Sequence, residues 1–109
     1  MNVKISCANG ELTAFLSGDI DHHTAREMRK VIDSRCESVH PTILKLDFSN
    51  VQFMDSSAIG LIMGRYRLMN LMNGYVKVVN VPSHLERLIA ISGVGALGVL
   101  EFKTKDVRI

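Results

Sequence analysis

The sequence predicts a single α/β domain over residues 1–109, in which a mixed β-sheet packs with about three α-helices in the order β-β-α-β-α-β-α-β. Two observations predict this class. An alternating apolar pattern near the N-terminus is interrupted by a tight turn, and apolar runs with helical spacing then alternate with short β-branched runs. A chain of 109 residues buries roughly two-thirds of the surface that its unfolded form exposes, which is enough for one core.

The N-terminal segment is predicted to form a β-hairpin. Apolar and polar residues alternate over residues 3–7 and again over residues 12–16, with Phe15 on the other face of the second run. Asn9-Gly10 lies between the two runs and is a strong signal for a two-residue turn, because both residue types tolerate a positive φ. We expect Gly18 to close the second strand.

An amphipathic helix is predicted next, with Asp21 as its N-cap because the carboxylate accepts backbone N–H groups that otherwise lack a partner. Apolar residues recur after it at three- to four-residue spacing, and charged residues occupy the remaining faces. The apolar positions are Ala25, Met28, Val31, Ile32 and Cys36. Pro41 ends the segment.

The central segment predicts a buried strand followed by a second helix. Residues 43–48 form a short, mostly apolar run, and Ser49-Asn50 begins the connection that follows it. Asp55 is predicted to cap the helix, which ends at Asn73-Gly74, with Gly in the left-handed cap conformation. The residues expected to point inward are Ile59, Ile62, Met63, Tyr66 and Met69.

The C-terminal segment predicts a β-branched strand over residues 75–81 and a third helix that starts at Pro82-Ser83. Leu85, Leu88 and Ile89 lie on one side of this helix, which is expected to end near Gly93. Residues 99–102 form the last short strand.

Composition and charge exclude several classes of function. The formal net charge is +2 and the basic residues are spread over several segments, whereas a nucleic-acid binder concentrates them in a stripe. We therefore expect no nucleic-acid partner. The apolar stretch at residues 58–63 is far too short to span a membrane, and no signal peptide is evident, so a cytoplasmic protein is expected. Cys7 and Cys36 are expected to be free thiols, buried or half-buried.

Three motifs that suggest a ligand or a catalyst are rejected. Residues 93–98 match G-x-G-x-x-G, but they follow a predicted helix and only 11 residues remain after them, too few for a dinucleotide-binding unit. His22-His23 lacks a second pair at ligand spacing, so no metal is expected. Ser56 has neither a placed base nor a G-x-S-x-G elbow around it, so we expect no enzyme and no cofactor.

The segment from Phe53 to Gly60 is the candidate functional site. A helix start after an interior α/β strand is where such folds present ligand and partner sites. Two hydroxyls, Ser56 and Ser57, occupy the first turn beside N–H groups that favour anions. Gly60 and Gly64 follow one turn apart, although each costs roughly 1 kcal/mol of helix stability. They would permit close approach of another surface, either the protein's own sheet or a partner.

Two paired motifs resemble the STAS domain, in particular the anti-sigma factor antagonists of the sporulation pathway. They are Phe53-Met54-Asp55-Ser56-Ser57-Ala58-Ile59-Gly60, with Gly64-Arg65-Tyr66 nearby, and Gly18-Asp19-Ile20-Asp21-His22-His23-Thr24-Ala25 upstream. The resemblance covers nearly the whole chain, residues 1–109. Ala58 and Ile59 stand where the family usually has Gly and Leu. Both changes keep the residues small or apolar, so we expect the switch to be retained, and the added methyl group close to Ser56 leaves the affinity for the kinase open.

The resemblance implies a phosphorylation switch. In that family the unphosphorylated antagonist binds an anti-sigma factor that is also a serine kinase, and the sigma factor is released. Phosphorylation of the antagonist by this kinase, here at Ser56 by position, ends the interaction, and a PP2C-type phosphatase reverses it. The partner surface implied is formed by Asp19, Asp21, His22, His23, Asp55, Ser57, Ile59, Gly60 and Met63. A monomer is expected in the free state.

Two alternatives stay open at the level of the sequence. One is a STAS antagonist that controls a general-stress sigma factor or belongs to a larger signalling assembly, because sigma-factor specificity is not written in these residues. The other is a nucleotide-binding or lipid-binding STAS domain associated with a transporter. The lack of a membrane segment in this sequence argues against the second.

Overall fold

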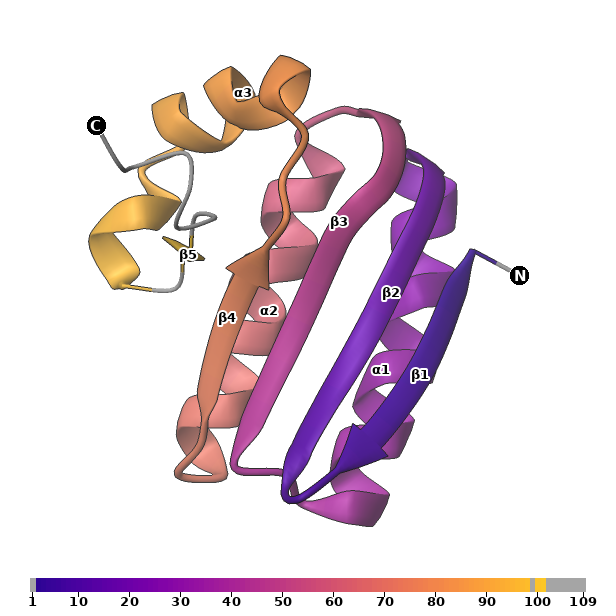
Figure 1. Ribbon diagram of the computed structural model, residues 1–109, viewed down its shortest axis with the longest axis vertical. Coiled ribbons are helices and arrows are strands. Elements are labelled where there is room, and N and C mark those ends of the chain that lie inside the picture. The colour runs from indigo at the N-terminus through magenta and orange to yellow at the C-terminus, as the bar shows by residue number, and fades with distance from the viewer. Residues whose placement is uncertain (1, 99, 102–109) are drawn as a thin grey trace.

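The computed structural model describes residues 2–98 and 100–101 of the chain, and these form a mixed five-stranded sheet. The strands lie in chain order across the sheet, with β1 antiparallel to β2 and every other pair parallel (Figure 1). Their bounds are Val3–Ala8 for β1, Glu11–Ile20 for β2, Ile43–Met54 for β3, Tyr75–Val79 for β4 and Leu100–Glu101 for β5.

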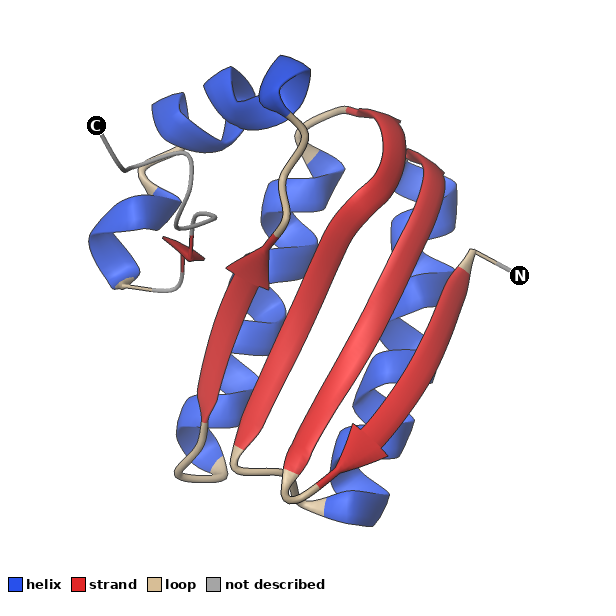
Figure 2. Ribbon diagram, viewed as in Figure 1, coloured by secondary structure: helices blue, strands red, loops and turns tan. Residues whose placement is uncertain are grey.

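Both long helices cover the same face of this sheet, and the short third helix lies beyond the end of β4 (Figure 2). The helices are α1 (His22–Val39), α2 (Ser57–Leu71) and α3 (Glu86–Ile91), with 3₁₀ turns η1 (Ser83–Leu85) and η2 (Val94–Leu97). The predicted class and element order are therefore confirmed. Within the described residues, no helix is both long enough and apolar enough to cross a lipid bilayer.

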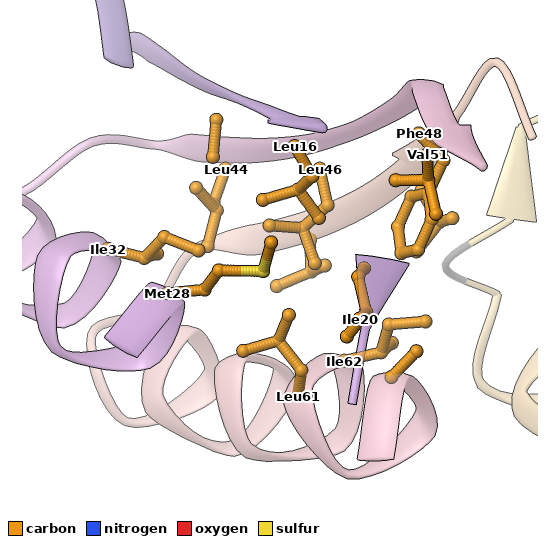
Figure 3. Close-up of a cluster of buried hydrophobic side chains, with 14 of the residues drawn as sticks. Leu16, Ile20, Met28, Ile32, Leu44, Leu46, Phe48, Val51, Leu61 and Ile62 are labelled. Carbon is orange, nitrogen blue, oxygen red and sulfur yellow. The ribbon is translucent and has the colours of Figure 1, made fainter. Parts of the chain in front are cut away.

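The core lies between the sheet and the two long helices (Figure 3). Alternate residues of each central strand point toward the helices, as a sheet with one covered face requires. The innermost side chains come from β2, β3, α1 and α2, and include Leu12, Leu16, Met28, Ile32, Leu44, Leu46, Phe48 and Ile62, each at most 1% exposed. This packing fixes the helices in position relative to the strand ends.

The hairpin prediction is confirmed, but two strands extend beyond their predicted ends. Asn9 and Gly10 both have a positive φ, 55° and 80°, which suits a tight turn between β1 and β2. Gly18 does not close β2; its φ of +77° lies where the pairing with β3 shifts register, and the strand continues to Ile20. β3 likewise runs through Ser49-Asn50 to Met54, because the longer β2 supplies its hydrogen-bonding partner.

The end of α2 and the strand after it differ from the prediction. Asn73, not Gly74, takes the left-handed conformation, with φ 61°. Gly74 is needed for space instead, since a Cβ there would lie 2.5 Å from Met69 Cε and 2.8 Å from the Thr42 carbonyl oxygen. β4 ends at Val79, and the following Asn80 has a positive φ of 57°.

The third helix begins, as predicted, just after Pro82, but its first turn is the 3₁₀ turn η1. Leu85 and Ile89 are buried and Leu88 is partly buried on the expected side. Gly93 ends the segment with a φ of +82°. Of the predicted strand over residues 99–102, β5 contains residues 100–101, and residues 99 and 102 lie outside the described residues.

The two cysteines lie in different environments. Cys36 is completely buried on α1, as expected, whereas Cys7 is exposed on β1, an edge strand of the sheet, which corrects the expectation for that thiol. Burial raises the pKa of the Cys36 thiol from 9.0 to about 11, with the Asp33 carboxylate contributing in the same direction.

This shift predicts a loss of stability in alkaline solution. The folded protein retains the Cys36 proton that the unfolded chain releases, so the thiol's contribution is fully present below pH 9 and is lost as the pH rises toward about 11. We expect about 2 kcal/mol of this loss by pH 11. Urea unfolding of wild type and Cys36→Ala between pH 9 and 11 measures this loss. The free energy of unfolding of Cys36→Ala should depend less on pH than that of wild type. Cys7→Ala is the control and should show the same pH dependence as wild type. Parallel profiles for all three proteins would contradict the prediction.

Candidate functional site

The two segments singled out in the sequence meet at the carboxyl ends of β2 and β3. These strands are parallel, and their last paired residues are Asp19 with Phe53 and Ile20 with Met54. The Asp55 backbone N–H donates to the Ile20 carbonyl oxygen at 3.1 Å. The start of α1 and the start of α2 therefore lie next to each other at the carboxyl ends of these two strands.

The start of α1 is fixed by a capping box, as the sequence predicts for Asp21. Its carboxylate accepts the backbone N–H groups of His23 and Thr24, both at 2.9 Å, and the Thr24 hydroxyl accepts the Asp21 N–H at 2.9 Å. The Thr24 backbone hydrogen bond is the main reason why the pKa of Asp21 lies below its ordinary value. Asp19, Asp21, His22 and His23 are all exposed.

At the start of α2, Ser56 occupies the N-cap position, but its side chain does not cap the helix. Ser56 is the N-cap residue, with helical dihedral angles, and its exposed side chain makes no capping hydrogen bond. Asp55 was predicted as the N-cap and instead precedes it by one residue, although its carboxylate accepts the Ser57 backbone N–H at 2.7 Å. The N–H groups that an N-cap side chain would accept, those of Ala58 and Ile59, donate instead to the carbonyl oxygens of Asp55 and Ser56, and the Ser56 side chain is exposed.

The inward face of α2 differs in part from the prediction. Ile62 and Met69 are buried as expected, but Ile59, Met63 and Tyr66 are only partly buried. The positions that fill the core are Ala58, Leu61, Ile62, Arg65 and Met69. The helix is rotated relative to the prediction because its first core residue is Ala58, and the apolar residues on nearly every face make its periodicity weak.

This rotation determines which residues the site presents. Ser56, Ile59, Gly60 and Met63 share the outer face of α2, at helical spacing. The methyl group of Ala58 is completely buried and packs in the core. A Cβ at Gly60 or Gly64 would meet nothing within 4 Å, so these glycines do not contact the sheet; they leave open space on the outside.

One exposed aromatic ring belongs to this surface and was not among the predicted partner residues. Phe53 is 59% exposed at the end of β3, two residues before Asp55. It points away from the core because Met54 takes the buried position in the strand alternation. Phe53 begins the candidate segment of the sequence, but the predicted end of the strand near residue 48 hid its place in the alternating pattern, so its exposure was not predicted.

A groove between α1 and α2 also adjoins the site, with a volume of about 460 Å³. His22 and Ser57 lie in its lining, and three arginines, Arg26, Arg29 and Arg67, line it as well. In the sequence these arginines are spread over two separate segments and form no basic run. The described part of the chain contains no cluster of three or more His, Cys, Asp or Glu residues that could hold a metal ion.

A buried ion pair joins the two helices at this groove. Arg65, on α2, is only 5% exposed, and its Nε lies 2.7 Å from Oδ1 of Asp33 on α1. That contact lacks hydrogen-bond geometry; the aligned hydrogen bonds run from Nη2 to Asp33 Oδ2 and from Nη1 to the Leu61 carbonyl oxygen, both at 3.2 Å. Burial raises the pKa of Asp33, and the positive charge of Arg65 opposes this rise. Burial lowers the pKa of Arg65, and the negative charge of Asp33 opposes this fall.

Comparison with known proteins identifies the family of this chain. The family model of the STAS domain matches residues 2–105. The anti-sigma F factor antagonist of Paenibacillus polymyxa is 38% identical over 95 residues, covering 85% of this chain and 81% of that protein. The anti-sigma-B factor antagonist of Bacillus subtilis is 25% identical over 93 residues, covering 85% of this chain and 84% of that protein.

A solved structure shares the fold. The anti-sigma factor antagonist SpoIIAA in its unphosphorylated form superposes with a TM-score of 0.81 at 24% identity, covering 95% of this chain and 90% of that one. The family match covers nearly all of the sequence, and the relative from Paenibacillus polymyxa matches over most of its length. This chain therefore belongs to the STAS domain family.

Proposed function

We propose that this chain is an anti-sigma factor antagonist: its unphosphorylated form binds an anti-sigma factor that is a serine kinase, which releases the sigma factor. Phosphorylation of Ser56 by that kinase ends the interaction, and a PP2C-type phosphatase restores it. The observation that carries the proposal is that the Ser56 side chain, at the start of α2 and beside the start of α1, is exposed and makes no capping hydrogen bond. The antagonists among its relatives support it.

The chemistry of the surface explains how one phosphate ends binding. Asp19, Asp21 and Asp55 are exposed around the two helix starts, so this edge already carries carboxylates. A phosphate at Ser56 adds about −1.5 to −2 charges at pH 7. A strongly hydrated dianion is costly to bury against a closely fitting partner without a basic counterpart. Binding is lost at the interface, without a conformational change in the antagonist.

The experiment that tests this proposal locates the phosphate. After incubation with the cognate anti-sigma kinase and ATP, peptide mass spectrometry should find one phosphate, on Ser56. Ser56→Ala should accept none, whereas Ser57→Ala should be modified like wild type, because Ser57 is partly buried and its N–H is held by Asp55. A phosphate on Ser57, or none on the wild-type protein, would overturn the assignment.

A second candidate is an antagonist in a general-stress pathway. It is favoured by the anti-sigma-B factor antagonists of Bacillus subtilis and of Listeria monocytogenes, which are 25% and 23% identical to this chain. The higher identity to an anti-sigma F factor antagonist, 38%, favours the sporulation type. Titration with the anti-sigma factors of both pathways distinguishes the two, since the cognate one should bind more tightly.

A further inference from the structure

The groove between α1 and α2 has a one-sided charge. From α1 it is lined by Arg26 and Arg29, and from α2 by Arg67, while no carboxylate lines it. Within the described ranges 2–98 and 100–101, none of these three guanidinium groups forms an ion pair. Asp33 lies behind the groove and is already bound to Arg65. The groove thus holds several guanidinium groups outside any ion pair of the described chain, although the formal net charge is only +2. Arg29 also lies close enough to Asp33 to oppose the rise in the pKa of that carboxyl.

The shape of the groove suits a segment of another chain. Gly60 and Gly64 lie one turn apart on its α2 side, and a Cβ at either position would meet nothing within 4 Å. A backbone or a row of short side chains can therefore approach α2 closely. The groove is open to solvent and not an enclosed cavity, which favours a segment of another chain over a small ligand.

The groove is continuous with the proposed docking surface. His22 and Ser57 line its end, and each is directly adjacent in the sequence to a residue at a helix start, Asp21 and Ser56. A partner that covers Ser56 extends from a surface rich in carboxylates into one rich in arginines. Acidic side chains of the partner that face the groove would then fix its orientation, because the opposite arrangement would place them against Asp19, Asp21 and Asp55.

We infer that this groove receives an acidic segment of the anti-sigma factor, held by Arg26, Arg29 and Arg67. The inference rests on the proposed function and adds to it a second contact region outside the phosphorylation site. The groove would contribute affinity for the anti-sigma factor, whereas phosphorylation at the start of α2 would control whether the complex forms. Arginine suits this role because its planar guanidinium binds carboxylates with two parallel hydrogen bonds.

The test compares two doubly substituted proteins with the same change in net charge. Arg29→Gln/Arg67→Gln removes two groove charges. Lys4→Gln/Lys30→Gln is the matched control, because Lys4 is exposed on β1 and Lys30 lines a separate hollow on the other side of α1. Affinity for the purified anti-sigma factor, with ADP, is measured at low and high salt, and thermal melting verifies the fold of each variant.

We expect the groove variant to bind about tenfold more weakly at low salt, with a reduced salt dependence, and the control to bind like wild type. Equal affinity of the groove variant and wild type would overturn the inference and leave the proposed function intact, as would equal weakening of both variants. Failure of wild type to bind at all would overturn both. If ATP raised the melting temperature of the free wild-type protein but not of the groove variant, the groove would be a nucleotide site and the inference would be wrong.

Discussion

Ser56→Asp should weaken binding to the anti-sigma kinase by about tenfold or more, because it places a fixed charge where the partner must come close. The exposed Ser56 side chain lies beside Asp55 and next to the start of α1, where Asp19 and Asp21 are also exposed. Ser56→Ala should bind like wild type and remain bound in the presence of ATP.

The fold should tolerate the same change. A negative charge at a helix N-terminus is favoured by up to ~1 kcal/mol, and the neighbouring Asp55 opposes it by a similar amount. Urea unfolding should therefore give a stability within about 0.5 kcal/mol of wild type. Ser83→Asp is a matched control, since Ser83 is an exposed serine at the start of η1. Equal affinity of Ser56→Asp and wild type would contradict the proposed repulsion.

Asp33→Ala should be the most destabilising of the substitutions considered, at about 3 kcal/mol, because it leaves a buried guanidinium without its carboxylate. Arg65 is 5% exposed and contacts Asp33 at 2.7 Å, so water cannot replace the lost partner fully. The pair also joins α1 to α2, and its loss should loosen the groove between them. Urea unfolding monitored by circular dichroism measures the change.

A second substitution separates the buried charge from other effects of the deletion. Asp33→Ala/Arg65→Met removes the charge and fills most of its volume with an apolar side chain, so it should recover more than half of the lost stability. Asp33→Asn keeps the size of the side chain and should fall between Asp33→Ala and wild type. If the double variant were less stable than Asp33→Ala, an unpaired buried charge would not be the cause of the destabilisation.

Local signals in the sequence were enough to predict the class and order of the elements. The Asn9-Gly10 turn and the Asp21 cap both form as predicted, since each depends on the backbone preferences and hydrogen bonds of a few adjacent residues. The helical spacing from Met28 to Cys36 also gave the buried face of α1 correctly. The candidate hydroxyl was likewise accessible to this reasoning, because Ser56 occupies a helix start in both the prediction and the structure.

Other features depended on partners distant in the sequence. β3 extends to Met54 because the length of a strand depends on its neighbour, here β2, and not on its own residues alone. The buried face of α2 was ambiguous because apolar residues occupy nearly all of its faces, and only packing against the sheet selected Ala58 over Ile59.

Charge shows the same division between sequence and structure. The sequence by itself determined the α/β class and a serine at a helix start, since these follow from patterns within single segments, and its two paired motifs resemble the STAS domain. Arg29 and Arg67 are distant in the chain and give no shared pattern there, yet α1 and α2 place them on one groove. The tertiary structure alone decided this, because packing both helices on one face of the sheet sets which side chains from different segments become neighbours.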